Sequence, residues 1–215
     1  MQAFIFDLDN TLYSQELNIF PIIDARINAY MSRKLGMPQE EVDELRRYYW
    51  NLYGVTLKGL MLHHGIDPED FLREVHDLDL AGILKPNPKL RQTLSQLQAD
   101  KFIFTNASQE HARNVLGLLD LQDLFQDIFD IRIADYQPKP YQEPYVKILK
   151  HLNLQAWQCV MVDDLPDNLK TAKDLGMQTV LIGDQDGHPY IDCCVPRACQ
   201  ILKAARTLSS RSRTI

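Results

Sequence analysis

The sequence contains few cysteines, no long apolar run and no excess of positive charge. Four cysteines among 215 residues are too few and too unevenly spaced for a disulfide framework, and their spacing matches no common zinc pattern. We therefore expect reduced thiols at Cys159, Cys193, Cys194 and Cys199. No apolar stretch approaches the roughly 20 residues needed to span a membrane.

The net charge of −6 argues against a protein that binds nucleic acid polymers or membrane surfaces through its overall field. An anionic small molecule would have to be bound by a few local cations. Hydrophobic residues make up 45% of the chain and charged residues 24%, which is ordinary for a globular core with a small additional domain. No targeting pattern is present at the start, so we expect a cytoplasmic protein. The composition leaves the oligomeric state open.

The stretch of residues 16–84 has helical periodicity and no strand pattern. Apolar residues recur every four positions over residues 19–35, and further helices are predicted from Pro38 to about Leu52, over 56–64 and over 68–76. Prolines at 86 and 88 prevent an uninterrupted helix on the return. We expect an all-helical cap at 16–84, inserted into a core of residues 1–15 and 85–208, followed by a disordered polar tail at 209–215.

Outside this insert, strands and helices alternate, which indicates an α/β protein with a doubly wound parallel sheet. Strands are predicted at residues 3–6, 102–104, 128–134, 159–162 and 178–182. Helices are predicted at 89–99, 109–119, 141–152, 167–176 and 195–208.

Polar residues follow four of these strands. Asp7 and Asp9 follow the first, Thr105 and Asn106 the second, Lys139 the third after a short loop, and Asp163 and Asp164 the fourth. The carboxyl ends of parallel strands gather along one edge of the sheet, which is where α/β proteins bind ligands. Taken singly, each group has an ordinary explanation, such as an acidic turn or a loop lysine. Together they predict a functional site at that edge.

The four segments FDLDNTL, FTNAS, the lysine of PKP, and VDDLPDN resemble the motifs of the haloacid-dehalogenase-like hydrolases. The resemblance covers the whole chain and implies a Rossmann-like core with a helical cap. Within that superfamily, YYWNLYGVTLKGL, ILKPNPKLR and FTNASQEHA are similar to the pyrimidine 5′-nucleotidase branch.

The resemblance implies roles for individual residues in the hydrolysis of a phosphate monoester. Asp7 is the expected nucleophile that forms an aspartyl-phosphate, and Asp9 the general acid and base. Thr105, Asn106 and Lys139 are expected to bind the phosphoryl oxygens.

Mg²⁺ is the expected cofactor, since two carboxylates repel a phosphate dianion unless a cation lies between them. The resemblance implies that its ligands are the carboxylates of Asp7 and Asp164 and the backbone carbonyl of Asp9. Asp163, Asn168 and Thr11 are expected to support the site without binding the metal directly.

The cap is the segment long enough to cover the sheet edge, so we expect it to select the substrate. Its aromatic residues can form cap core, but one or two can stack on a planar base; these residues are Tyr48, Tyr49, Trp50 and Tyr53. The resemblance to the pyrimidine 5′-nucleotidase branch implies UMP or CMP as substrate. The nearest alternative is a sugar-phosphate phosphatase or a phosphomutase. From a different class, a phosphate-sensing or scaffold protein is a further alternative, although every position of the motifs carries the chemical group it needs.

Overall fold

The computed structural model describes residues 1–184 and 187–211. A six-stranded sheet forms its centre, with the order β3-β2-β1-β4-β5-β6, and every neighbouring pair is parallel. The strands are β1 (Ala3–Phe6), β2 (Asp100–Phe104), β3 (Asp127–Phe129), β4 (Cys159–Asp163), β5 (Gln178–Ile182) and β6 (Cys193–Val195). After β3 the chain crosses back past β1 to start β4. The sheet therefore has its topological switch point beside β1, where ligands bind in open α/β sheets.

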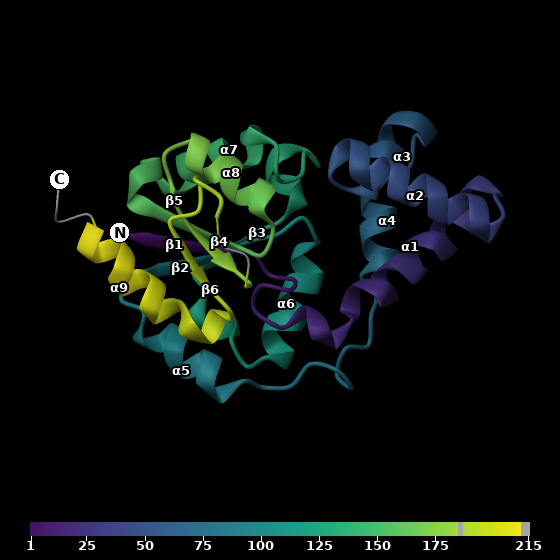
Figure 1. The fold of residues 1–215 in the computed structure, drawn as a ribbon. Helices are drawn as coiled ribbons and strands as arrows, with labels where there is room; N and C mark the ends of the chain where they lie inside the picture. Colours follow the sequence, from purple (N-terminus) through teal and green to yellow (C-terminus); the bar gives the residue numbers. More distant parts are fainter. Residues whose placement is uncertain (185–186, 212–215) are drawn as a thin grey trace.

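Helices cover both faces of the sheet, as the near-continuous apolar strands require (Figure 1). On β1, Phe4 and Phe6 pack in one apolar cluster and Ala3 and Ile5 in another, because alternate side chains point to opposite faces. The first cluster includes α5 (Pro88–Gln96), α6 (Gln109–Leu118) and α9 (Ile201–Arg211). The second includes α7 (Gln142–Leu152) and α8 (Pro166–Asp174).

The insert between β1 and β2 contains α1 (Ile19–Leu35), α2 (Gln39–Tyr53), α3 (Thr56–His64) and α4 (Pro68–Val75). We call residues 19–75 the helical segment. Figure 1 shows it as a group of its own beyond the end of the sheet. The predicted helix ends are confirmed, since Gly36, Gly54 and Gly65 stop α1, α2 and α3 with left-handed φ angles of 67°, 82° and 62°.

One glycine in this segment is required by packing. A Cβ on Gly59 would lie 2.2 Å from Cγ of Tyr49, so α2 and α3 reach their contact distance only with glycine there. Short 3₁₀ turns join several elements of the chain: η1 (Gln15–Leu17), η2 (Gln122–Leu124), η3 (Ile131–Ala134), η4 (Ala156–Gln158) and η5 (Ala198–Gln200).

Three predictions are wrong in detail. The strand predicted at 128–134 is β3 followed by η3, because the carboxylate of Asp130 accepts from the backbone N–H of Arg132 and starts a helical turn. The helix predicted at 195–208 begins only at Ile201, and the sequence analysis missed β6 before it. The tail predicted to be disordered at 209–215 is helical as far as Arg211, where α9 ends, and 212–215 lie outside the described residues.

Within the described residues, none of the helices combines the length and apolar character that a membrane crossing requires. No disulfide joins Cys159, Cys193, Cys194 or Cys199 in the described part of the chain.

Candidate active site

Adjacent strand ends bring Asp7 and Asp163 together. β1 pairs with β4 in a register that sets Phe6 beside Val162, and the backbone N–H of Asp7 donates to Val162 O at 2.8 Å. Asp7 thus directly follows β1, and Asp163 is the last residue of β4. The sheet, not a loop, sets the spacing of these two acids.

Lys139 lies between the two acids and is almost fully buried. Its Nζ donates to Asp7 Oδ1 at 2.7 Å, to Asp163 Oδ2 at 2.9 Å and to the carbonyl of Phe104 at 2.8 Å. Burial alone would lower the pKa of Lys139, but the two carboxylates outweigh burial and raise it. A permanent positive charge therefore lies at the carboxyl edge of the sheet.

The carboxylate of Asp163 is saturated by donors. Asn168 Nδ2 lies 2.9 and 3.0 Å from its two oxygens, and the backbone N–H of Leu165 donates to Oδ1 at 2.9 Å. With Lys139 on Oδ2, neither oxygen is left without a donor. This geometry agrees with a supporting role for Asp163 and Asn168.

The carboxylates of Asp7, Asp163 and Asp164 offer oxygen atoms within 4.8 Å of one another. Burial and the neighbouring carboxylates raise the pKa of Asp7 well above its usual range against the charge of Lys139, and raise the pKa of Asp164 to about 7. Asp164 accepts a long bond of 3.4 Å from the hydroxyl of Thr11. This set of hard oxygen donors, crowded and incompletely neutralised, fits a divalent cation such as Mg²⁺.

Asp9 is bound differently from the other acids. Tyr13 donates its hydroxyl to Asp9 Oδ1 at 2.7 Å, and His111 Nε2 lies 2.8 Å from the same oxygen. Burial alone would raise the pKa of Asp9, but His111 and Tyr13 outweigh burial and lower it. The same contact raises the pKa of His111 although burial opposes the shift.

Thr105 and Asn106 lie at the end of β2, next to Lys139. The side-chain amide of Asn106 makes two hydrogen bonds to the backbone of Lys139. Its Nδ2 donates to Lys139 O at 3.1 Å, and its Oδ1 accepts from Lys139 N at 2.8 Å. Asn106 thus orients the Lys139 loop, a contact that the sequence analysis did not predict. Thr105 Oγ1 accepts from Ala107 N at 3.0 Å and keeps its own proton for another acceptor. Ser108 caps α6, and its hydroxyl accepts from the backbone N–H of His111.

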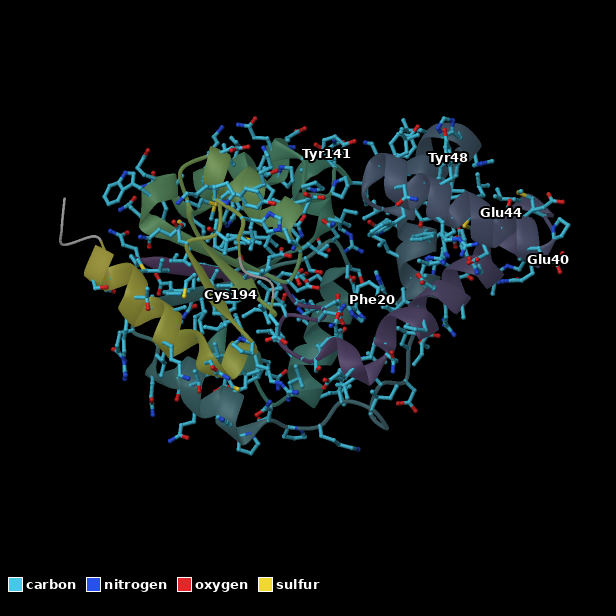
Figure 2. All side chains as sticks on the ribbon, in the orientation of Figure 1. Phe20, Glu40, Glu44, Tyr48, Tyr141 and Cys194 are labelled. Carbon is cyan, nitrogen blue, oxygen red and sulfur yellow. The ribbon has the colours of Figure 1, made fainter. Side chains whose placement is uncertain are left out.

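A cleft of about 560 Å³ connects these groups to the helical segment. Phe20 of α1 and Trp50 of α2 line it with 43% and 53% of their surface exposed, and Arg47 and Asn51 line it beside Trp50. Figure 2 labels Phe20 in the gap between the helical segment and the sheet.

The other members of the predicted aromatic cluster do not line this cleft. Tyr49 is buried, and its hydroxyl lies 2.8 Å from His64 Nε2, while Tyr53 makes the matching contact with His63 at 2.7 Å. Tyr48 is exposed at the outer edge of the helical segment (Figure 2). Tyr49 therefore belongs to the core of the segment, and Trp50 faces the site. His63 and His64 thus each contact a tyrosine of α2.

Sequence reasoning missed three residues of the site: Tyr13, His76 and His111. His111 stands within the FTNASQEHA segment, three residues after the Ser108 cap, but that segment served only as a resemblance. His76 lies where α4 ends, far from the strand-end motifs in sequence, and its ring stacks on His111. No local pattern distinguishes these histidines from packing residues.

The sequence is similar to proteins of comparable length and to at least one longer protein. The chain is 28% identical over 204 residues to Phosphate metabolism protein 8 of Saccharomyces cerevisiae, a match that covers 84% of this chain but 61% of that protein's length. It is 24% identical over 195 residues to Phosphorylated carbohydrates phosphatase of Thermotoga maritima, covering 84% of both. The crystal structure of a HAD phosphatase from Thermococcus onnurineus has the same fold, with a TM-score of 0.64 at 24% identity over 95% of this chain and 98% of that one.

The sequence model of one family matches residues 1–176, a span that includes both acids after β1, the end of β2, Lys139 and the acids at the end of β4. It is the model of the haloacid dehalogenase-like hydrolases. The chain belongs to this family.

Proposed function

We propose that the protein is a phosphate monoester hydrolase that works through an aspartyl-phosphate on Asp7. The observation that carries the proposal is the grouping of four chemical parts in one cleft: a carboxylate paired with a buried lysine, a second acid, a hydroxyl and the further carboxylate of Asp164. A phosphate-sensing protein would not need the second acid, Asp9.

In the first step, a carboxylate oxygen of Asp7 attacks phosphorus and the bond from phosphorus to the ester oxygen breaks. Asp9 gives its proton to that oxygen, so that the leaving group departs as an alcohol. The negative charge of the bound phosphate favours the protonated form of Asp9 that this step needs. Lys139 and the hydroxyl of Thr105 stabilise the charge that develops on the phosphoryl oxygens.

In the second step, water attacks phosphorus and passes a proton to Asp9, and the bond between phosphorus and the Asp7 oxygen breaks. Inorganic phosphate leaves, and both acids return to their starting states. The donors from Tyr13 and His111 favour the ionised form of Asp9, which is the form that accepts this proton.

Asp7 and Asp164 are the residues we expect to bind Mg²⁺ through their side chains, with the backbone carbonyl of Asp9 as a third ligand. Both carboxylates have unused oxygen lone pairs, whereas the oxygens of Asp163 are already occupied. The ion, when bound, would supply positive charge that lets a phosphate dianion approach two acids.

For the substrate we propose a pyrimidine nucleoside 5′-monophosphate, UMP or CMP, selected by residues 16–84 acting as a cap. Phe20 and Trp50 offer exposed aromatic faces in the cleft, and Arg47 and Asn51 offer donors for base or sugar oxygens. The resemblance to the pyrimidine 5′-nucleotidase branch supports the same choice. A sugar phosphate is the second candidate, since one relative is named for phosphorylated carbohydrates. We also propose a cytoplasmic location, which cysteines without a disulfide among the described residues support.

The test is a comparison of kcat/KM for UMP, CMP, AMP, GMP and a set of hexose phosphates in the presence of Mg²⁺. We expect UMP or CMP to exceed both purine nucleotides by at least about tenfold, since a pocket shaped for one ring excludes a larger base. Equal rates across the four nucleotides, or a sugar phosphate hydrolysed far faster, would contradict the substrate while leaving the phosphatase chemistry intact. No phosphate release from any of these esters would contradict the chemistry itself.

A further inference from the structure

The two donors to Asp9 both bind one oxygen of its carboxylate. Tyr13 Oη and His111 Nε2 lie 2.7 and 2.8 Å from Oδ1, and Oδ2 accepts no hydrogen bond from the described part of the chain. Asp9 lines the cleft, and its side chain keeps 11% of its surface exposed. The carboxylate is therefore fixed on one oxygen, and its other oxygen is the one available to carry a proton to and from a substrate.

His111 is itself tightly fixed. Only 1% of the residue is exposed, and its backbone N–H donates to the Ser108 hydroxyl at 3.2 Å in the first turn of α6. Its ring stacks on His76, with ring centroids 4.9 Å apart and the planes at 30°. His76 lies at the end of α4, where the chain leaves the helical segment, so the stack joins that segment to α6 of the core.

Packing alone does not explain two buried histidines at this position, because each leaves a polar ring atom without a hydrogen bond in the described part of the chain. Nδ1 of His111 and Nδ1 of His76 are both buried without a hydrogen-bond partner among the described residues. An apolar side chain of similar size would fill the same space without leaving polar atoms unsatisfied. What an apolar residue cannot supply is the N–H that His111 directs at Asp9.

We propose that His111 is a positioning residue that orients the Asp9 carboxylate for proton transfer through Oδ2, and that His76 keeps the His111 ring against Asp9. His111 retains its own Nε2 proton throughout and exchanges none with the substrate. Because His76 is part of the return from the helical segment, the orientation of Asp9 depends on that segment lying in place. The inference rests on the proposed phosphatase function.

The experiment measures kcat and KM for phosphate esters with good and poor leaving groups, namely p-nitrophenyl phosphate and a simple alkyl phosphate. A poor leaving group needs the proton from Asp9, whereas p-nitrophenolate departs with little help. Loss of an oriented general acid should therefore be selective. For His111→Ala we expect kcat/KM, which reports only the steps up to formation of the aspartyl-phosphate, to fall roughly 10- to 100-fold for the alkyl ester and by less than about threefold for the aryl ester.

Three further variants separate positioning from a merely structural effect. His111→Gln can still present an N–H to Oδ1 and should recover most of the alkyl rate. His76→Leu keeps the volume of the ring but not its stacking, and should give a smaller loss of the same selective kind. His151→Ala removes a surface histidine whose Nε2 lies 4.0 Å from Asp127, and should change neither rate.

The retained aryl activity of each variant shows that it is folded. An equal loss of both rates in His111→Ala, or no recovery in His111→Gln, would overturn the proposal. A wild-type protein that hydrolyses neither ester nor any nucleotide would instead refute the phosphatase function, before any variant is compared.

Discussion

Lys139 and Asp163 form an ion pair in which both side chains are almost completely buried, with Nζ 2.9 Å from Oδ2. Removal of either charge leaves the other without its partner in a low-dielectric environment, which costs more than the pair contributes when intact. Lys139 also neutralises Asp7, so a single lysine sets the charge balance of two acids. The stability of the fold and the chemistry of the site are therefore coupled through one residue.

Lys139→Met should destabilise the protein and abolish phosphate release. The buried carboxylates of Asp7 and Asp163 would both lose the lysine that pairs with them, and we expect the free energy of unfolding to fall by about 3–5 kcal/mol in urea titrations. Lys147→Met is the control, because Lys147 pairs with Asp135 and Glu143 at the surface and its removal should change the free energy of unfolding far less. Similar losses of unfolding free energy in the two variants would show that the buried ion pair stabilises the protein no more than a surface pair does.

Asp7→Asn should abolish turnover without unfolding the protein, because an amide is a poor nucleophile. We expect phosphate release to fall at least about a thousandfold, on the scale of nucleophile removal in other enzymes. Asp174→Asn changes an exposed acid of α8 that pairs with Lys170, and should retain the wild-type rate. Near-normal turnover by a verified Asp7→Asn sample would show that another group is the nucleophile.

Trp50→Ala should raise KM for UMP by roughly 5- to 100-fold, since stacking on an aromatic face contributes about 1–3 kcal/mol per base. Hydrolysis of a small alkyl phosphate, which has no base to stack, should be nearly unchanged. Tyr48→Ala provides the matched control: Tyr48 is an exposed aromatic residue of the same helix that does not line the cleft. If the two variants behave alike, Trp50 does not contact the base.

Binding of Mg²⁺ should be visible without any measurement of activity. Protein dialysed against EDTA should rise in melting temperature on addition of Mg²⁺, because the ion binds only the folded carboxylate cluster. Asp164→Asn should remove most of that rise, whereas Asp174→Asn should preserve it. An equal rise in both variants would place the ion elsewhere.

Glu69 of α4 connects the helical segment to the core through Arg132 and Tyr136. Arg132 donates to both Glu69 oxygens at 2.7 Å, and Tyr136 Oη lies 2.6 Å from Oε1. These donors lower the pKa of Glu69 from 4.5 to about 2. A lowered pKa contributes stability above the unfolded value of 4.5, and that contribution is lost as the pH falls toward 2.

Glu69→Gln should therefore lower the free energy of unfolding near pH 7, and its difference from wild type should shrink below about pH 4.5. Nearly half of the Glu69 side chain is exposed, so solvent screening limits the expected effect to about 1 kcal/mol. Glu44→Gln, on the exposed side of α2, should show no such difference at any pH. A gap that stays constant with pH would mean that the Glu69 charge does not stabilise the docked segment.

Much of the fold could be predicted because its elements have strong local patterns. The four-residue repeat from Ile19 to Leu35 and the glycines after α1, α2 and α3 fixed those helices closely. β6 was missed because three residues followed by Pro196 show too little alternation to distinguish a strand. η3 was mistaken for a strand because its residues are mostly apolar. The hydrogen bond from the backbone N–H of Arg132 to the Asp130 carboxylate, which starts the helical turn, has no clear sequence pattern.

Part of the candidate site could likewise be predicted from the sequence, and part could not. The meeting of Asp7, Lys139 and Asp163 could be predicted, since residues that follow parallel strands gather at one edge. The contact between Asp9 and His111 could not be predicted. The two residues are 102 positions apart, and His111 lies within helix α6 rather than at the end of a strand. The choice of Trp50 over its tyrosine neighbours depends on how α2 is rotated about its axis, which the packing of Tyr49 against Gly59 determines.

The two outermost strands of the sheet have a consequence for aggregation. β3 and β6 contain three residues each, and Pro196, which has no backbone N–H, follows β6 directly. An open sheet edge is a template onto which another chain can add a strand, and short edges interrupted by proline give it few hydrogen bonds to make. The inner strands β1, β2, β4 and β5 lie between these borders, so their apolar backbones can pair with another chain only when the sheet itself comes apart.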